Sequence, residues 1–281
     1  MESLKYNIAL TGVPRSGTTL TCHLLNKVHN TVALHEPMDV FELPRLKDDE
    51  TRIKTIKTFF ENTRNSLLTK GTALTKHHNQ KIPDNPIASE KEGIQPRKSI
   101  VERSEIPISK PLNTNFYLII KHPGAFTALL SYLQPEFACF AVIRNPISVL
   151  ASWNSVDLLV NQGHAPIAEQ LNPKLTQALN QKEDKIERQL FLLSWFFEQY
   201  ATYLPAQAIL RYEETVATQG KSLKVVVPAA ENLNEDLHSK NKNPLYNPEE
   251  MKQLGKRLLA SSGAYWNFYS KESVETLLNQ Y

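Results

Sequence analysis

A glycine-rich segment near the N-terminus has the residue types of an anion-binding loop. The segment lies between an apolar run and a helical pattern, and it reads Gly12-Val13-Pro14-Arg15-Ser16-Gly17-Thr18-Thr19. In that setting, successive backbone N–H groups and the start of a helix point at one position, where they bind an anion through hydrogen bonds and the helix dipole. The sequence therefore predicts a phosphate-binding loop at residues 12–19.

The cation of this loop is an arginine rather than the usual lysine. The spacing copies Gly-x-x-x-x-Gly-Lys-Ser/Thr, but Thr18 occupies the lysine position and Arg15 lies inside the loop. A nucleoside triphosphatase needs that lysine on its β- and γ-phosphates. A planar guanidinium suits an oxyanion such as a transferring sulfuryl group or the phosphate bridging to it. A nucleotide kinase or NTPase remains an alternative, and Thr18 disfavours it.

A second candidate anion site follows a later apolar run. Arg144 comes directly after residues 139–143, Pro146 suits the first turn of a helix, and Ser152 lies about two helical turns further on. Taken alone, Arg144 could equally pair with a surface carboxylate, which would contribute little. Together with the loop, it predicts a ligand that carries two separated anionic groups.

Candidates for acid–base chemistry follow two other apolar runs. Glu36 comes after residues 31–34, and Lys121 and His122 come after residues 116–120. The carboxyl ends of parallel strands form the edge where open α/β sheets bind ligands. We expect Glu36 to be the general base. Because neighbours in a strand alternate faces, His35 should point away from Glu36.

The quoted motifs resemble those of the sulfotransferases that use 3′-phosphoadenosine-5′-phosphosulfate, in particular the tyrosylprotein and bacterial branch with a glutamate base. Residues 12–20 are similar to the family's 5′-phosphosulfate loop, and Arg144 with Ser152 is similar to its 3′-phosphate motif. Arg211-Tyr212-Glu213 resembles a family segment whose tyrosine lies by the nucleotide. The resemblance covers residues 6–36 and 116–214.

The resemblance implies an activity and a set of site residues. The chain would move a sulfuryl group from 3′-phosphoadenosine-5′-phosphosulfate, its donor cosubstrate, to the hydroxyl or amine of an unidentified acceptor, without a metal and with 3′,5′-phosphoadenosine as the product. The implied catalytic residues are Glu36, Arg15, Lys121 and His122. In the family, a lysine at the position of Lys121 would stabilise charge on the departing 5′-phosphate, and some members use a histidine near that of His122 as the base, so His122 is the reserve base. The implied nucleotide-binding residues are Pro14, Arg15, Ser16, Gly17, Thr18, Thr19, Arg144, Ser152 and Tyr212. A non-catalytic protein that only binds the nucleotide is a second alternative.

The elements that must position these residues alternate along the chain. Apolar runs of strand length occur at residues 6–10, 31–34, 116–120, 139–143 and 207–210. Helical patterns occur at residues 18–29, 48–68, 146–160 and 183–203. Continuous apolar runs are typical of parallel strands that are buried on both faces. The sequence therefore predicts an α/β fold: a three-layer sandwich with a central parallel sheet and a P-loop-type phosphate-binding loop.

The length of 281 residues suits one large domain. We expect residues 1–281 to form a single sulfotransferase domain, with a substrate-side insertion at about 45–114 and a helical part from about 222. Residues 70–114 lose apolar periodicity, so they are either a disordered connection or part of the cover over the substrate.

Composition limits the partners of the chain. A net charge of +3 is small for this length and gives no reason to expect nucleic acid or a membrane surface. The cysteines, Cys22 and Cys139, lie in apolar stretches, which favours neither a disulfide framework nor a zinc site. No apolar stretch reaches the length of a membrane span, and residues 1–5 carry no secretory pattern. We expect a cytoplasmic protein, or a catalytic domain expressed without its anchor, that is a monomer or a homodimer.

Overall fold

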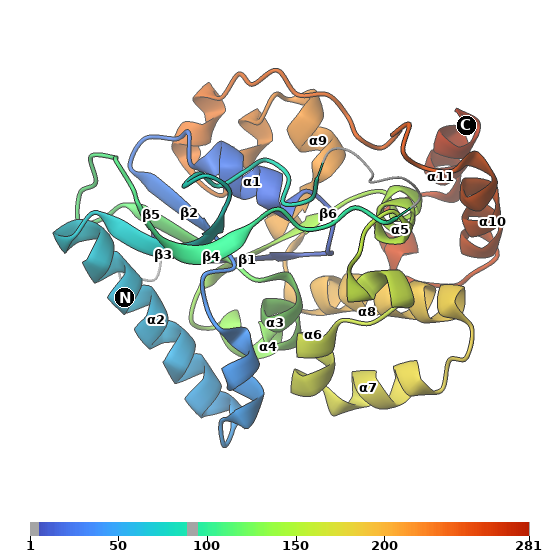
Figure 1. Ribbon diagram of the computed structural model, residues 1–281, viewed down its shortest axis with the longest axis horizontal. Helices are drawn as coiled ribbons and strands as arrows, with labels where there is room; N and C mark the ends of the chain where they lie inside the picture. The colour runs from blue at the N-terminus through green and yellow to red at the C-terminus, as the bar shows by residue number, and fades with distance from the viewer. Residues whose placement is uncertain (1–5, 89–94, 281) are drawn as a thin grey trace.

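A parallel sheet of five strands forms the centre of the computed structural model, in the order β2-β5-β1-β6-β7 (Figure 1). The structure describes residues 6–88 and 95–280. The strands are β1 Asn7–Gly12, β2 Thr31–His35, β5 Tyr117–Lys121, β6 Ala138–Ile143 and β7 Ile209–Arg211. Each lies within two residues of a predicted apolar run. The structure thus confirms the predicted α/β class with a central parallel sheet.

The parallel register brings the carboxyl ends of all five strands to one edge. β1 lies between β5 and β6, with Leu10 opposite Lys121 and Gly12 opposite Val142. His35 at the end of β2 is also opposite Lys121. The polar residues that follow these strands therefore meet along one edge of the sheet, as parallel pairing requires.

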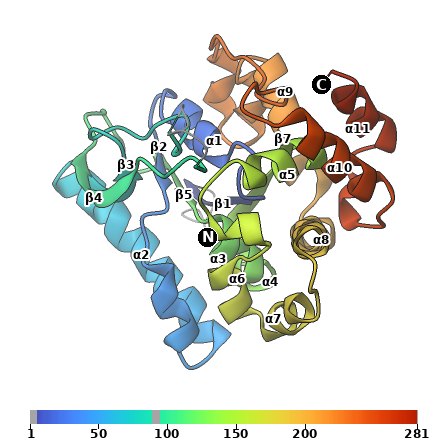
Figure 2. The same ribbon diagram turned by 45° about the vertical axis from the view of Figure 1, so that its right-hand side comes forward.

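Helices flank the sheet on both sides. α1 Thr18–Leu25 and α9 Tyr212–Ala217 lie on one side, and α3 Pro123–Ala128, α4 Leu130–Leu133 and α8 Lys185–Tyr203 lie on the other (Figures 1 and 2). The other helices are α2 Asp49–Thr69, α5 Pro146–Asn154, α6 Pro166–Leu171, α7 Pro173–Asn180, α10 Pro248–Leu259 and α11 Lys271–Leu278. One connected cluster of buried apolar side chains extends from Ile8 in β1 to Val274 in α11.

The helix after β6 begins as predicted and ends earlier. Pro146 occupies its first turn, and the Asn145 side chain accepts the Ile147 N–H at 3.2 Å. The helix was expected to reach residue 160, but α5 ends at Asn154. Beyond it the backbone bonds to Arg97 instead, through Arg97 N to Ser155 O at 3.2 Å and Asp157 N to Arg97 O at 2.9 Å. These contacts with a distant segment replace the next helical turn.

The predicted insertion contains regular structure that the sequence did not indicate. A hairpin of β3 Thr72–His77 and β4 Glu102–Pro107 lies beside β2, where the Thr75 hydroxyl accepts the His35 N–H at 2.9 Å. Residues 70–114 are therefore neither wholly irregular nor detached from the sheet. Residues 89–94 of this segment lie outside the described residues. Residues 1–5, for which no secretory pattern was expected, lie outside them as well.

The C-terminal part is only partly helical. The predicted helical part from about 222 contains short 3₁₀ turns, η5 Lys221–Val225 and η6 Pro228–Asn232, before α10 and α11. Residues 233–247, between η6 and α10, have no helix or strand and cross the carboxyl edge of the sheet. Within residues 6–88 and 95–280, no helix combines the length and apolar character needed to cross a membrane.

Candidate functional site

The loop after β1 adopts a conformation that depends on its glycines. Gly17 has a φ of 98°, and a Cβ there would lie 2.7 Å from Cδ2 of Tyr212. Arg15 also has a positive φ, of 71°, which a side chain rarely tolerates. Backbone strain of this kind concentrates where the surrounding structure needs it, commonly at binding sites. The loop therefore combines an unfavourable backbone conformation at Arg15 with a close contact between Gly17 and Tyr212, the residue that follows β7.

The two serines predicted to bind the nucleotide are engaged within the protein. The Ser16 hydroxyl donates to Val142 O at 2.7 Å, and the side chain is fully buried, so it fixes the loop to β6. The Ser152 hydroxyl accepts a hydrogen bond from Arg15 Nε at 3.3 Å. Pro14 is held by its carbonyl, which accepts the indole N–H of Trp153 at 2.8 Å. The loop is thus anchored to both β6 and α5.

Arg15 lies beside the second anion site. Besides Ser152, its guanidinium donates to Asn85 Oδ1 at 3.0 Å, and its backbone carbonyl accepts from Arg144 Nη1 at 3.3 Å. Burial and the neighbouring charge of Arg97 lower the pKa of Arg15 to about 10, so it stays positively charged at neutral pH. Within the described part of the chain, its side-chain hydrogen bonds are to Ser152 and Asn85, and none reaches Glu36.

Arg144 is buried at the end of β6 and stacks on Tyr212, with its Cζ 4.6 Å from the ring centroid. Its Nε donates to Asn241 Oδ1 at 2.6 Å, and its Nη2 donates to the Lys240 carbonyl. The Tyr212 hydroxyl accepts the Lys240 N–H at 2.8 Å. The segment 233–247 thus directly contacts Arg144 of the second candidate anion site. An incoming anion would replace the carbonyl oxygen of Lys240 and the amide oxygen of Asn241 on this guanidinium.

Glu36 lies where two lysines meet. Its Oε1 is 2.7 Å from Lys121 Nζ, and its Oε2 is 2.6 Å from Lys76 Nζ. Burial alone would raise the pKa of Glu36, but Lys121, His35 and Lys76 outweigh burial and hold the pKa well below its usual value. Lys121 Nζ is also 3.5 Å from the Thr19 hydroxyl, so one buried ammonium contacts both the carboxylate and the loop.

The expectation that His35 points away from Glu36 is wrong. His35 Nε2 lies 3.5 Å from Glu36 Oε1. Alternation fails here because Glu36 has a φ of 47° and has left the extended conformation. Burial lowers the pKa of His35 to about 4, so the imidazole is neutral at pH 7 and places a polar but uncharged group beside Glu36.

His122 lies deeper than Glu36. Its Nε2 accepts the Met38 N–H at 3.1 Å, and burial lowers its pKa to about 3. A ring nitrogen that accepts a backbone N–H has no free lone pair for an acceptor proton. These contacts favour Glu36 over His122 as the base.

Most of the predicted site residues line one cleft at the carboxyl edge of the sheet. They are Pro14, Arg15, Gly17, Thr18, Thr19, Glu36, Lys121, Arg144 and Tyr212. Ser16, Ser152 and His122 do not line it. The sequence missed further lining residues: Asp84, Asn85 and Pro86 from the insertion, and Asp236, Leu237, His238 and Lys240 from residues 233–247. No motif marks them, because each enters the cleft from an irregular segment.

A larger cavity adjoins this cleft. It has a volume of about 810 Å³ and is lined by Val40 and Phe41 of η2 (Val40–Arg45), by Lys76 and Arg103 of the β3–β4 hairpin, and by most of residues 157–167. The cleft and the cavity share Pro14, Glu36, Pro123 and Leu158. Glu36 therefore faces both spaces, and a molecule in one can approach a molecule in the other beside its carboxylate.

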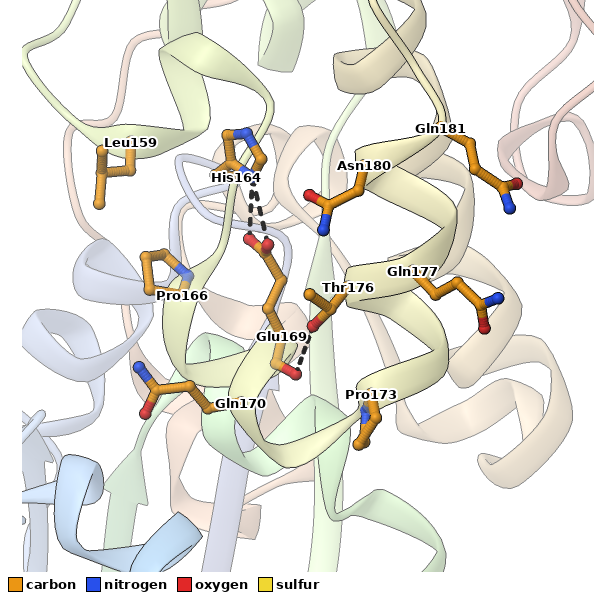
Figure 3. A pocket seen from close by; sticks show the side chains of 10 residues that line it. All are labelled: Leu159, His164, Pro166, Glu169, Gln170, Pro173, Thr176, Gln177, Asn180 and Gln181. Carbon is orange, nitrogen blue, oxygen red and sulfur yellow. Dashed lines mark hydrogen bonds and ion pairs between the residues drawn. The ribbon is translucent and has the colours of Figure 1, made fainter.

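A shallower hollow lies between α6 and α7 (Figure 3). Its carboxylate, Glu169, bonds to His164 Nδ1 at 3.1 Å and accepts the Ala165 N–H at 2.7 Å. The Glu169 carbonyl accepts the Thr176 hydroxyl at 2.8 Å (Figure 3). These bonds join the segment before α6 and α6 itself to α7, so His164, Glu169 and Thr176 have structural roles.

No candidate metal site occurs within the described ranges, where no three histidine, cysteine, aspartate or glutamate side chains gather closely enough to bind an ion. Cys22 and Cys139 are free and buried. Neither the known protein-family profiles nor the curated proteins contain a match to this chain.

Proposed function

We propose that the chain is a sulfotransferase that moves a sulfuryl group from 3′-phosphoadenosine-5′-phosphosulfate to an acceptor hydroxyl or amine. The observation that carries this proposal is the position of Lys121, 2.7 Å from Glu36 and 3.5 Å from Thr19 of the loop. One cation thus joins a candidate base to a candidate phosphate site. A cation in that position can stabilise the charge that develops during in-line group transfer.

The donor would occupy the cleft lined by residues 12–19, Arg144 and Tyr212. In our proposal, the backbone of the loop and the start of α1 bind the 5′-phosphosulfate, as a P-loop-type phosphate site does. Arg144 and the nearby guanidinium of Arg15, which Ser152 holds through a hydrogen bond, bind the 3′-phosphate. The stacking of Arg144 on Tyr212 supports this, because it fixes the planar cation for a bidentate contact.

The chemical step would be a single displacement at sulfur. The acceptor oxygen or nitrogen forms a bond to sulfur while the bond from sulfur to the bridging phosphate oxygen breaks. The acceptor proton goes to Glu36, and the electron pair of the broken bond stays on the 5′-phosphate, which leaves as 3′,5′-phosphoadenosine. Lys121 stabilises the charge on the departing oxygen.

The charge of the transferred group explains why side-chain cations suffice in this proposal. A sulfuryl group carries less negative charge than a phosphoryl group, so its transition state needs less neutralisation. Lys121 supplies positive charge beside the loop, and Glu36, which borders both the cleft and the cavity, lets an acceptor approach from the cavity.

The proposal is tested by incubating the protein with the ³⁵S-labelled donor and a panel of phenols, alcohols and amines. We expect labelled product and 3′,5′-phosphoadenosine to appear in equal amounts, and neither to appear with Glu36→Gln. Binding of the donor without product from any acceptor would favour a non-catalytic nucleotide-binding protein. Transfer of phosphate from ATP would favour a kinase.

A further inference from the structure

The β3–β4 hairpin places two cations directly opposite one another. Lys76 and Arg103 are register partners in the antiparallel ladder, so their side chains leave the same face of the hairpin. Like charges in that position are destabilising. Both side chains line the cavity of about 810 Å³ beside Glu36. The hairpin therefore maintains an unfavourable pair of positive charges on the wall of this cavity.

The partners of these cations leave binding capacity free. Lys76 donates to Glu36, while Arg103 makes one ion pair with the described residues, from Nη2 to Asp39 at 3.3 Å. The Asp39 side chain is 54% exposed, so this pair contributes little and exchanges easily with a ligand. The Arg103 guanidinium has five N–H donors and uses one of them in this ion pair. A carboxylate entering the cavity can thus bond to Arg103 through two of the remaining donors.

The rest of the cavity is mainly apolar. Three large apolar side chains at its rim, Phe41, Leu158 and Leu159, remain exposed, and Met38 and Val160 form buried parts of the lining. An exposed apolar rim is typical of a site that receives an apolar ligand. Asp157 also lines the cavity, so a ligand with a positive charge is the competing possibility.

We propose that this cavity binds acceptors that combine an apolar skeleton, a reactive hydroxyl and a carboxylate or similar oxyanion, with the oxyanion on Arg103 and Lys76 and the hydroxyl at Glu36. The inference rests on the proposed sulfotransferase function for the role of the hydroxyl. It assigns the β3–β4 hairpin to the choice of acceptor. A volume of about 810 Å³ suits a small molecule.

Three probes with one skeleton test the proposal: 3-(4-hydroxyphenyl)propanoate, 4-propylphenol and tyramine. Each is titrated by calorimetry into the whole protein, with and without 3′,5′-phosphoadenosine. We expect the carboxylate probe to bind at least tenfold more tightly than the other two. In Arg103→Gln that advantage should fall below threefold, whereas Arg45→Gln, whose arginine is exposed on η2 and does not line the cavity, should retain it.

The outcomes separate the two proposals. Equal affinities, a preference for tyramine, or a carboxylate preference that survives Arg103→Gln would overturn the anion subsite. Failure of all three probes to bind would overturn it as well. If 3′,5′-phosphoadenosine does not bind, the sulfotransferase proposal fails. The titrations without nucleotide then still decide whether the cavity prefers an anion.

Discussion

Lys121 binds Glu36 twice, through its backbone carbonyl, which accepts the Glu36 N–H at 3.0 Å, and through its ammonium, 2.7 Å from the carboxylate. The first bond extends the pairing of β2 with β5 by one residue past the end of β2. The second places the charge of Lys121 on the candidate base. The backbone pairing of two parallel strands thus fixes the distance between the two groups on which the proposed chemistry depends.

Replacement of the candidate base should separate binding from turnover. Glu36→Gln keeps the shape of the side chain and removes the proton acceptor, so we expect kcat to fall by about 10²–10⁴. The shift in Tm that 3′,5′-phosphoadenosine produces should stay within 1 °C of the wild-type shift, which corresponds to a change in Kd of less than an order of magnitude. Steady-state assays with the labelled donor measure the first quantity, and Glu42→Gln on the exposed part of η2 is the control. A Glu36→Gln enzyme that keeps a tenth of the wild-type kcat would show that another group acts as the base.

The glycine in the loop should be indispensable for nucleotide binding. Gly17→Ala combines an unfavourable φ of 98° with a Cβ 2.7 Å from the Tyr212 ring, so the loop must shift. We expect at least a tenfold loss of affinity for 3′,5′-phosphoadenosine. Gly71→Ala is the matched control, because Gly71 has a φ of 68° and nothing lies within 4 Å of the added Cβ. Gly71→Ala should cost stability and leave affinity unchanged, and equal losses of affinity in both variants would contradict the account.

Acid should destabilise the protein through its buried histidines. Burial lowers the pKa of His122 to about 3 and that of His35 to about 4, so the folded state binds fewer protons than the unfolded state below pH 6.5. Stability is therefore complete above that pH and is lost as the pH falls towards 4. At pH 5 each histidine should cost about 2 kcal/mol of unfolding free energy.

Urea unfolding between pH 7 and pH 4.5 measures this dependence. His122→Gln, whose amide oxygen can accept the Met38 N–H, should flatten the profile by the contribution of one histidine. Exposed His238 serves as the comparison, and His238→Gln should leave the profile unchanged. A His122→Gln profile parallel to the wild type would show that His122 is already protonated in the folded state.

Turnover should not require a divalent ion. The positive charge in the proposed transition state comes from the side chain of Lys121, so we expect kcat in excess EDTA to equal that in buffer to within about twofold. Added Mg²⁺ should not restore activity to Lys121→Ala. Loss of turnover in EDTA, with recovery on addition of Mg²⁺, would favour phosphoryl-transfer chemistry.

The sequence was sufficient for the sheet and for the residues at its edge. Continuous apolar runs identified all five parallel strands, because strands buried on both faces have little room for polar residues. Since parallel strands share one carboxyl edge, the polar residues after them could be grouped before the structure was known. Glu36, Lys121, Arg144 and Tyr212 line one cleft for this reason.

The remaining parts of the site depend on contacts between distant residues. β4 is mostly exposed and polar, so its sequence carries no apolar signal, and the hairpin with Lys76 and Arg103 was missed. Asn85 and Lys240 reach the cleft from irregular segments, whose paths no periodicity encodes. His35 was misplaced because the left-handed conformation of Glu36 ended the alternation one residue after β2.

The second candidate anion site, at Arg144, offers a test of how the nucleotide is recognised. Arg144→Gln removes the guanidinium that stacks on Tyr212, so we expect affinity for 3′,5′-phosphoadenosine to fall by about 10–100-fold. Affinity for adenosine 5′-phosphate, which lacks the 3′-phosphate, should change less than threefold. Competition titrations measure both values, and equal losses for the two nucleotides would place Arg144 outside the 3′-phosphate site.

The most direct test of the account compares two nucleotides that carry the same number of phosphates. Tm is measured with 3′,5′-phosphoadenosine and with ADP, each at the same concentration and without Mg²⁺. At about 100 times its Kd, 3′,5′-phosphoadenosine should add about 2.7 kcal/mol of stability, equivalent to about 5 °C or more, while ADP adds less than half of that. A shift with ADP that equals or exceeds the shift with 3′,5′-phosphoadenosine would contradict the account.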